Sequence, residues 1–501
     1  MGKRVIRIID DLVAEVANEQ KLDLNLTSEN MGEAHGLIVA RLSQSPKPFK
    51  EIIKEIFDDN GLNKEKIIDF HKRITLGINH HSIEQHSYTS IGFENVSIIA
   101  TNKYFENKRL AAYLERSTRY QDFSKPSYYI PKELNEEQKK KYVEAIETLF
   151  KTYQTILPKI EEEISRVYKE KGVIEKENNI KKKAFDSSRY LLPCSTYTNF
   201  AMSTNSQVYR ALITDLLSIE NTELTESANE LQKELEKIYP ALVSKEVTKE
   251  DTGRKEHLNK NNKITPLKTN NQNEKIIVEE FEFENIQNTV KLINYTKNAE
   301  ELMVYEYLVK EGYYPEMKNG KVILEEKEIT EEEKKEIIAK LFEYNKIEEK
   351  PHRTAELANY YFETILDFGA GRDVHRNRML TWIDSLVSPE YGYAVPYYLT
   401  KETKQQYEAA LKKAYECWVE LVKEGVSKEI AQYVLPLGTN YKVFYNINAK
   451  ELHHVAKTRT TKHAHYSYRE YVHQLVECAK QAQPLIANNI KDYYEKETAI
   501  L

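Results

Sequence analysis

The densest run of polar side chains in the first half of the chain lies between residues 106 and 120. Arg109, Glu115, Ser117 and Arg119 fall within eleven consecutive positions of that run. A guanidinium such as that of Arg119 can hold a phosphate or a carboxylate through its fork of donors. Ser117 and the backbone amides after it can complete such a cradle, and Glu115 can accept a ring N–H. The run therefore predicts a site for a phosphate-bearing ligand; the alternative is an exposed helix face laced with ion pairs.

Three histidines stand close together upstream, in Asn79-His-His-Ser-Ile-Glu-Gln-His86. His80 and His86 could ligate a metal. No further cysteine or carboxylate stands at useful spacing, so we expect polar side chains that close a ligand pocket and no metal. Ser82 is a second candidate for that pocket, or the cap of a helix that begins there.

A second cluster of cationic side chains lies in residues 367–380. Arg372, His375, Arg376 and Arg378 follow the sequence Gly-Ala-Gly, which we interpret as a turn. Such density beside glycine suits an anionic cofactor with two phosphates. The glycines do not fit G-x-G-x-x-G, which argues against a Rossmann site. The alternative is a helix that carries surface arginines.

Near the C-terminus, residues 448–465 combine a helical pattern with basic side chains. On a helix, Asn448 and Leu452 share one face, and His454 and Arg459 lie just beyond it. The segment predicts a further phosphate site, or a basic surface.

Charge and composition exclude several classes of protein. The net charge of -6 comes from 73 basic and 79 acidic residues, which argues against a nucleic-acid coat or an anionic membrane as partner. No stretch reaches membrane-spanning length, and no signal-peptide core precedes Asp10. Cys194, Cys417 and Cys478 lie far apart. We therefore expect a cytoplasmic protein in a reducing compartment.

The chain repeats itself. Tyr-Tyr occurs in residues 127–133 and again in 396–402, each followed by a long amphipathic pattern, through Tyr142–Ile156 and Tyr407–Val422. Leu-Pro pairs follow at Pro193 and Pro436, each 12 residues before an asparagine, Asn205 or Asn448. A repeat this long indicates a domain duplication and not a solenoid.

Strand-like runs accompany these helices and predict an α+β fold. They lie at Arg4–Ile9, Tyr88–Ile99, Thr289–Asn294 and Tyr360–Asp367. Residues 244–274 are almost without large apolar side chains and predict a polar linker. We expect a first half at residues 1–243, the linker, and a second half at 275–501. Each half should hold a mixed small sheet with long helices.

Taken together, the motifs resemble those of the flavin-dependent thymidylate synthases, the family of thymidylate synthase complementing proteins. The first half retains His80-x-Ser82, Ser188-Arg-Tyr-Leu-Leu-Pro193 and the Glu115, Ser117, Arg119 and Tyr120 of the family signature. Asn107-Lys108-Arg109 stands where the family has Arg-His-Arg. The second half retains Arg376-Asn377-Arg378 and Arg459, whose first-half position is Leu216. It loses Glu-x-Ser-x-Arg-Tyr in residues 384–389, and Gln432 replaces the arginine before Leu-Pro.

Each half thus lacks what the other keeps, and the resemblance implies one kind of composite site. Its nucleotide would be held by Glu115, Ser117, Arg119, Tyr120, Arg189 and Arg459. FAD would lie near His80, Ser82, Arg109, Arg376, Asn377, Arg378, Asn448 and His454. Because family sites are built from several subunits of a homotetramer, the resemblance implies a homodimer of this chain that imitates it.

The activity implied by the resemblance is the reductive methylation of dUMP to dTMP, with NADPH and 5,10-methylenetetrahydrofolate as co-substrates. The flavin performs the redox step, so no side chain is expected to be catalytic and Ser117 is a ligand. Alternatives are another uridine-containing substrate, or a non-catalytic flavin- or nucleotide-binding homologue. Pro193-Cys194 is also similar to the cysteine-dependent thymidylate synthases. The apolar context of Cys194 predicts a buried structural thiol.

Overall fold

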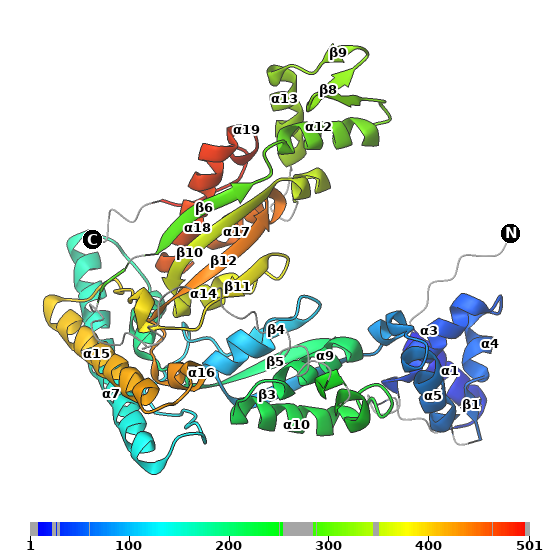
Figure 1. Cartoon of the computed structure of the whole chain (residues 1–501), viewed down its shortest axis with the longest axis horizontal. Coiled ribbons are helices and arrows are strands. Elements are labelled where there is room, and N and C mark those ends of the chain that lie inside the picture. The colour runs from blue at the N-terminus through cyan, green and yellow to red at the C-terminus, as the bar shows by residue number, and fades with distance from the viewer. Residues whose placement is uncertain are drawn as a thin grey trace, which may run out of the picture. The chain divides into compact units, whose positions relative to one another are not determined.

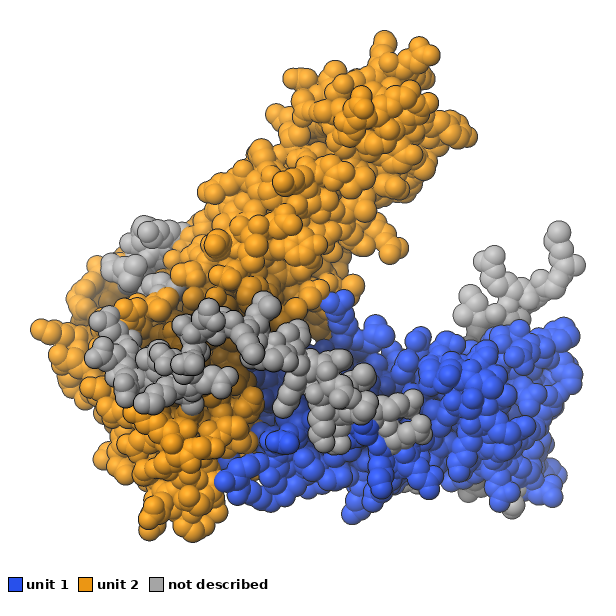
Figure 2. Space-filling model, in the orientation of Figure 1, with its two compact units in different colours: residues 1–116, 131–133, 197–276 blue, residues 117–130, 134–196, 277–501 orange. Residues whose placement is uncertain are grey.

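The computed structural model describes residues 9–22, 27, 31–59, 61–249, 251–253, 284–286, 288–343, 350–462 and 464–495. The chain forms two compact units, coloured separately in Figure 2. Unit 1 holds residues 1–116, 131–133 and 197–276, and unit 2 holds 117–130, 134–196 and 277–501. Unit 2 therefore draws on both halves of the sequence.

Unit 1 contains a three-stranded antiparallel sheet in the order β3-β5-β4. Its strands are β3 (Tyr88–Ser97), β5 (Tyr197–Asn205) and β4 (Ala112–Glu115). The helical elements α6 (Ile98–Ala100), η3 (Thr101–Phe105), α9 (Ser206–Leu217) and α10 (Thr222–Glu236) share one apolar core with it. A second core lies among α1 (Ile9–Glu19), α3 (Ala34–Gln44), α4 (Phe49–Lys54), α5 (Lys64–Phe70) and the hairpin β1 (Phe57–Asp58) and β2 (Gly61–Leu62). Between α5 and β3 stand η1 (His71–Leu76) and η2 (His81–His86).

Unit 2 contains a four-stranded antiparallel sheet in the order β11-β12-β10-β6 (Figure 1). Its strands are β11 (Thr381–Asp384), β12 (Asn440–Asn448), β10 (Asn359–Asp367) and β6 (Thr289–Tyr295). Beside it lie α14 (Phe368–His375), α17 (Ala449–Arg459), α18 (Tyr466–Ala482) and α19 (Pro484–Ala487). Between β6 and β10 the chain forms α12 (Ala299–Lys310), the hairpins of β7 (Glu316–Lys318), β8 (Lys321–Leu324) and β9 (Lys327–Glu328), and α13 (Glu331–Phe342).

The long helices α7 (Glu136–Glu170) and α15 (Lys401–Lys423) of unit 2 pack side by side (Figure 1). Helix α7 begins with a capping box, in which Asn135 and Gln138 each bond the other's backbone N–H. Helix α8 (Glu177–Ser188) follows α7 and leads into η4 (Arg189–Leu191). The corresponding elements after α15 are α16 (Lys428–Ala431) and η7 (Gln432–Val434).

Side chains alternate along the central strands of unit 2, as a sheet covered on one face requires. Tyr360, Phe362 and Leu366 of β10 are buried. Tyr361 of β10 and Phe444 of β12, on the other face, remain 43% exposed. One face of the sheet therefore carries the core and the other carries uncovered apolar side chains.

The two sheets repeat one topology, since β3-β5-β4 matches β10-β12-β11 in order and direction. In each unit a buried hydrogen bond between a serine and a carboxylate lies where the first of these strands, β3 or β10, leads into the next helix. Ser97 Oγ donates to Glu223 at 2.8 Å in unit 1, and Ser467 Oγ donates to Asp367 at 2.6 Å in unit 2. The serine and the acid have exchanged positions while the bond is kept.

The predicted strands Thr289–Asn294 and Tyr360–Asp367 and both long helices are confirmed. The predicted run Tyr88–Ile99 is a strand as far as Ser97, and Ile98 and Ile99 begin α6. Residues 4–8 of the expected strand Arg4–Ile9 lie outside the described residues, and Ile9 is the first residue of α1. Of the expected linker, residues 245–249 are helical and residues 254–274 lie outside the described residues.

The interpretation of Gly-Ala-Gly as a turn is wrong, because Gly369 and Gly371 lie inside α14. Asp367 caps that helix by accepting the N–H of Ala370 at 2.7 Å. A Cβ on Gly371 would overlap the hydroxyl of Tyr441. The glycine is needed for close packing of the helix on β12 and not for a turn.

A buried carboxyl group, that of Glu33, makes the stability of unit 1 depend on pH. Glu33 Oε1 accepts the N–H groups of Ala241 and Leu242 at 2.8 and 2.9 Å, and its carbonyl oxygen accepts Nε2–H of His71 at 2.8 Å. Burial raises the pKa of Glu33 from 4.5 to about 7. Burial lowers the pKa of His71 from 6.5 to about 4.

Because the pKa of Glu33 is raised in the fold from 4.5 to about 7, unit 1 loses stability as pH rises from about 4.5 to about 7, where only the unfolded chain is ionised. Glu33→Gln keeps the acceptor oxygen without the charge. We expect this variant to exceed the native chain in free energy of unfolding, and the excess should be about 2–3 kcal/mol larger at pH 8 than at pH 5. Hydrogen exchange of the α3 amides, corrected for intrinsic rates, measures the difference. The exposed Glu65→Gln is the control, and an equal gain at both pH values contradicts the assignment.

Candidate anion-binding site

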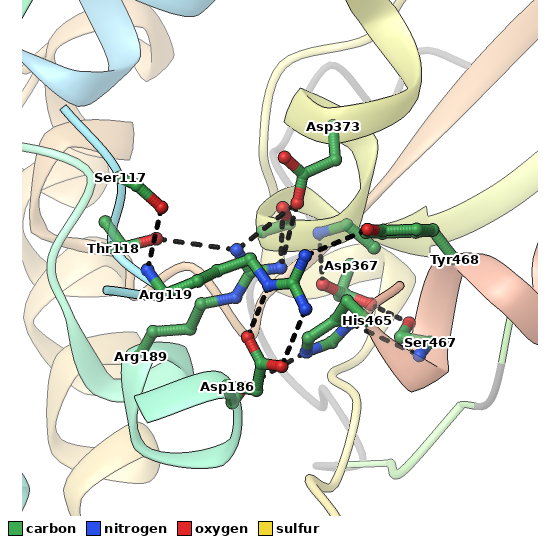
Figure 3. Close-up of polar contacts among 12 residues, drawn as sticks. Ser117, Thr118, Arg119, Asp186, Arg189, Asp367, Asp373, His465, Ser467 and Tyr468 are labelled. Atoms are coloured by element: carbon green, nitrogen blue, oxygen red, sulfur yellow. Dashed lines mark hydrogen bonds and ion pairs between the residues drawn. The ribbon is translucent and has the colours of Figure 1, made fainter. Parts of the chain in front are cut away.

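The site in unit 2 is built around Asp373, which lies on α14 six residues after the capping acid Asp367. The carboxylate of Asp373 receives Arg189 from η4, with both terminal nitrogens 3.3 Å from Oδ2 (Figure 3). Arg189 also donates to the carbonyl of Gly369 at 3.2 Å and to Thr118 Oγ1 at 3.4 Å. Only 2% of Arg189 is exposed. A buried guanidinium of the first half is thus fixed by a helix of the second.

Arg119 forms a second buried ion pair nearby. Its Nε and Nη2 donate to the two oxygens of Asp186 at 2.6 and 2.9 Å, and its Nη1 donates to Tyr468 Oη at 3.0 Å. Burial alone would lower the pKa of Arg119, but the bonds from Asp186 outweigh it and raise the pKa. The fork that we expected to face a phosphate is closed on Asp186. In this structure Arg119 therefore braces the site and orients Tyr468.

Four arginines act on the single carboxylate of Asp373. Burial alone would raise its pKa, but the charges of Arg189, Arg376, Arg119 and Arg372, in that order of effect, hold it well below the usual range. The Nη1 atom of Arg376 lies 3.8 Å from Asp373 Oδ1, and 33% of the Arg376 side chain is exposed. The cluster thus reaches the surface at Arg376, while Arg372 is buried.

Arg189 and Arg459 each have a guanidinium nitrogen without an acceptor among the described residues. The Nε atoms of Arg189 and Arg459 are buried and have no hydrogen-bond partner among the described residues. Arg459 is the last residue of α17 and lies close enough to Tyr468 to counter the rise that burial causes in the phenol's pKa. A buried unpaired donor is costly. The arrangement therefore suits an anionic acceptor supplied from outside the chain.

A neutral histidine supports the cluster from α18. His465 caps that helix by accepting the N–H of Ser467 at 3.2 Å, and its Nε2 donates to the carbonyl oxygen of Asp186 at 3.1 Å. Burial holds the pKa of His465 well below its usual value. Its ring stacks on Tyr466 with centroids 4.2 Å apart. It positions Asp186 without adding charge.

Sequence reasoning missed Asp186, Asp373, His465 and Tyr468. Asp186 could have been found, because it stands three residues before Arg189, a helical spacing typical of ion pairs, although its partner is Arg119. Asp373 could have been found inside the arginine cluster. The contacts of His465 and Tyr468 are between segments more than 270 residues apart, and no local pattern signals them.

The other expected residues of unit 2 lie around the cluster with local partners. Ser117 Oγ accepts the N–H of Arg119 at 3.2 Å, and Tyr120 is exposed with Lys182 Nζ 4.9 Å above its ring. Asn377 donates to the carbonyl of Val374 at 2.8 Å. Asn448 caps α17 by accepting the N–H of Glu451 at 2.9 Å. Arg378 and His454 are half-buried.

The remaining expected residues belong to unit 1. Glu115 ends β4 and is buried, whereas His80, Ser82 and Arg109 are exposed. His80 precedes the 3-10 helix η2, which has no side-chain cap, so Ser82 does not cap it. Among the described residues, the group of potential metal ligands that comes together is His473, Glu477 and Asp492 of unit 2, and not His80 with His86.

The cysteines and helices agree with two further expectations. Cys194 is fully buried, as its apolar context predicts. Cys194, Cys417 and Cys478 form no disulfide. None of the described helices is long and apolar enough to cross a bilayer.

Comparison with known families identifies the class. The family described as thymidylate synthase complementing protein (Thy1) matches residues 26–251 and 291–485, which is most of the chain. The chain belongs to this family. The match falls on two segments, as the repeated sheet topology requires, and confirms the expected α+β fold of two fused domains.

The chain is also similar to several individual proteins. The UPF0159 protein Ta1429 of Thermoplasma acidophilum is 26% identical over 491 residues, with 91% of this chain and 94% of the relative aligned. A flavin-dependent thymidylate synthase of Clostridium tetani is 26% identical over 206 residues, which cover 40% of this chain and 77% of that enzyme. A solved structure, a UMP/dUMP methylase PolB from Streptomyces cacaoi bound with 5-Br dUMP, aligns with 41% of this chain and 95% of its own at 16% identity and a TM-score of 0.33.

The buried pair of Arg119 and Asp186 should be strongly coupled. Removing one partner leaves an uncompensated buried charge, so Asp186→Leu and Arg119→Leu should each destabilise unit 2 by about 3–5 kcal/mol. The double variant should cost less than the sum by about 0.5–3 kcal/mol. Urea unfolding of the four proteins, followed by the fluorescence of Trp382 and Trp418, measures the cycle. Strict additivity would show that the pair does not interact.

Proposed function

We propose that the chain is a flavin-dependent thymidylate synthase that converts dUMP to dTMP. The single observation that carries the proposal is the arginine cluster around Asp373 in unit 2, with the unpaired Nε atoms of Arg189 and Arg459. It joins the family membership to a structure that can hold phosphate. The overall reaction balances as dUMP, 5,10-methylenetetrahydrofolate, NADPH and a proton giving dTMP, tetrahydrofolate and NADP⁺.

The nucleotide phosphate would be bound by Arg189 and Arg459. Charge-assisted bonds from guanidinium to phosphate are stronger than neutral ones. Arg119, held by Asp186, contributes positive charge and fixes Tyr468. We further assign Glu115, Ser117 and Tyr120 to the nucleotide from the family signature.

The residues present also fit a flavin dinucleotide. Its diphosphate needs several cationic donors. Arg376 and Arg378 lie just after the end of α14, separated by Asn377, and His454 is half-buried on α17. Burial lowers the pKa of His454, so it would meet the flavin as a neutral imidazole that can donate or accept. When bound, FAD supplies the hydride chemistry that no side chain can supply. We assign Asn377, Asn448, His80, Ser82 and Arg109 to the same cofactor.

The protein's own contribution is positioning. Orientation of a bound reactant can lower a barrier by roughly 7–11 kcal/mol in favourable cases. The buried pairs Arg189–Asp373 and Arg119–Asp186 are preorganised for this, because their donors are fixed before a ligand arrives. We expect the enzyme to work in the cytoplasm without a nucleic-acid or membrane partner.

Tritium release from [5-³H]dUMP tests the function. With NADPH, FAD and methylene-tetrahydrofolate, the native chain should release tritium and form dTMP. Arg459→Ala should raise the dissociation constant of dUMP by about 10-fold or more, since each charge-assisted bond contributes about 1.5–3 kcal/mol. The exposed Arg166→Ala, on α7 and paired with Glu163 and Glu170, is the matched control. A chain that binds FAD and dUMP but releases no tritium would favour another uridine-containing substrate; a chain that binds neither would contradict the proposal.

We propose further that the chain is a homodimer. Its support is the uncovered face of the unit 2 sheet, where four strands each present an apolar side chain. These are Ile293, Tyr361, Ile383 and Phe444, all at least 43% exposed. Contiguous exposed apolar surface commonly marks a protein interface. A second copy of the same sheet is the partner that the family's oligomeric sites imply.

Substituting aspartate on this face should separate the subunits. Ile383→Asp with Phe444→Asp should shift the mass from two chains to one in light scattering coupled to size-exclusion chromatography. Ile174→Asp changes a fully exposed isoleucine elsewhere in unit 2 and should leave the dimer intact. A native chain that is monomeric at all concentrations, or a dimer unaffected by the double change, would contradict this interface.

A further inference from the structure

The two Leu-Pro elements of the repeat lie against each other inside unit 2. Pro193 and Pro436 form an antiparallel bridge. The N–H of Cys194 donates to the carbonyl of Leu435 at 2.8 Å, and the N–H of Leu437 donates to that of Leu192 at 2.9 Å. The short helices η4 and η7 therefore occupy equivalent places, and so do their first residues, Arg189 and Gln432.

Arg189 and Gln432 each bond a residue at the equivalent position of their own copy of the repeat. Arg189 Nη1 donates to Thr118 Oγ1 at 3.4 Å, and Gln432 Oε1 accepts the N–H of Val387 at 3.2 Å. Thr118 stands three residues after Glu115, the end of β4, and Val387 stands three residues after Asp384, the end of β11. The two contacts are equivalent by position, so a direct comparison of the two side chains is justified.

The two side chains differ in what they leave for a ligand. Arg189 is charged, is held by Asp373, and keeps a buried Nε without an acceptor among the described residues. Gln432 is neutral and fully buried, and it uses its amide nitrogen on the carbonyl of Glu429 at 3.0 Å. Both ends of this neutral amide are hydrogen-bonded to backbone groups of the same chain. It therefore offers no charge-assisted bond to a phosphate.

The helix that carries the supporting acid Asp373 also differs from its counterpart in the first copy. Asp373 is the sixth residue after the capping Asp367, and the sixth residue after the equivalent cap Ser97 is Lys103. The helix after Ser97 also contains a π-helical turn over Thr101–Phe105, which changes its register. Counted from the cap, the first copy has a lysine where the second has the acid that pairs with Arg189.

We infer that each chain binds one phosphate monoester of the nucleotide type at this repeated element, on the Arg189 side, and that the Gln432 side is a closed structural copy. The inference rests on the proposed function and deepens it. Two copies of the family fold in one chain would bind two nucleotides if both Leu-Pro elements were competent. The geometry assigns binding to one of them.

Isothermal titration calorimetry counts the nucleotide sites: the full chain is first saturated with FAD and then titrated with dUMP. The expected stoichiometry is one dUMP per chain, and two per chain overturns the inference. Arg189→Gln, which gives the first element the residue of the second, should weaken dUMP by about 10-fold or more. Gln432→Met, of similar volume, should leave affinity and stoichiometry within about twofold. Far-UV circular dichroism checks the fold of both variants.

The outcomes separate the inference from the function on which it rests. Loss of dUMP binding in Gln432→Met, with Arg189→Gln unaffected and both folded, would place the site on the other element and overturn the inference alone. If the native chain binds no dUMP at all, the proposed function fails; inorganic pyrophosphate is then titrated in the same way. One pyrophosphate per chain lost in Arg189→Gln supports a single anion site, and two, or none, overturns it.

Discussion

The carboxylate of Asp373, of which only 16% of the side chain is exposed, is the constraint on which the site depends. Guanidinium groups as buried as Arg189 and Arg372 are expensive to remove from water unless an acid pairs with them. Asp373 supplies that acid and remains ionised because four arginines lower its pKa. Asp186 does the same for Arg119. These pairs fix donors in place before any ligand binds, and they require that segments from both halves of the sequence fold into one unit.

The repeat has kept its geometry while exchanging its chemistry. The buried bond between Ser97 and Glu223 reappears between Ser467 and Asp367 with the acid on the opposite partner. The bond needs only that one partner accepts and the other donates, so the exchange keeps the hydrogen bond. The change from Arg189 to Gln432 is different, because it preserves a packing contact and removes a charge. Duplication allows that loss, since one copy can retain the charged site while the other supports it.

The sequence predicts the fold better than the site. Period-two runs such as Tyr360–Asp367 and the long apolar pattern of α7 identify their elements because burial on one face imposes those periods. The Gly-Ala-Gly segment misled, since the packing of Tyr441 against Gly371 is invisible in local sequence. For the site, the resemblance to the family motifs pointed to Arg119, Arg189, Arg376 and Arg459. The acids Asp186 and Asp373 stand beside these motifs in the sequence and could have been named. Their pairing with Arg119 and Arg189 was not predictable, because contacts between distant segments leave no local pattern.

A crystal structure of the chain with bound dUMP tests the central claim most directly, because it shows which donors the phosphate takes. The account predicts phosphate oxygens at about 3 Å from the Nε of Arg189 or of Arg459, with Asp373 and Asp186 still paired to their arginines. A nucleotide phosphate bound at any other place, with both Nε atoms still facing only protein, would contradict it.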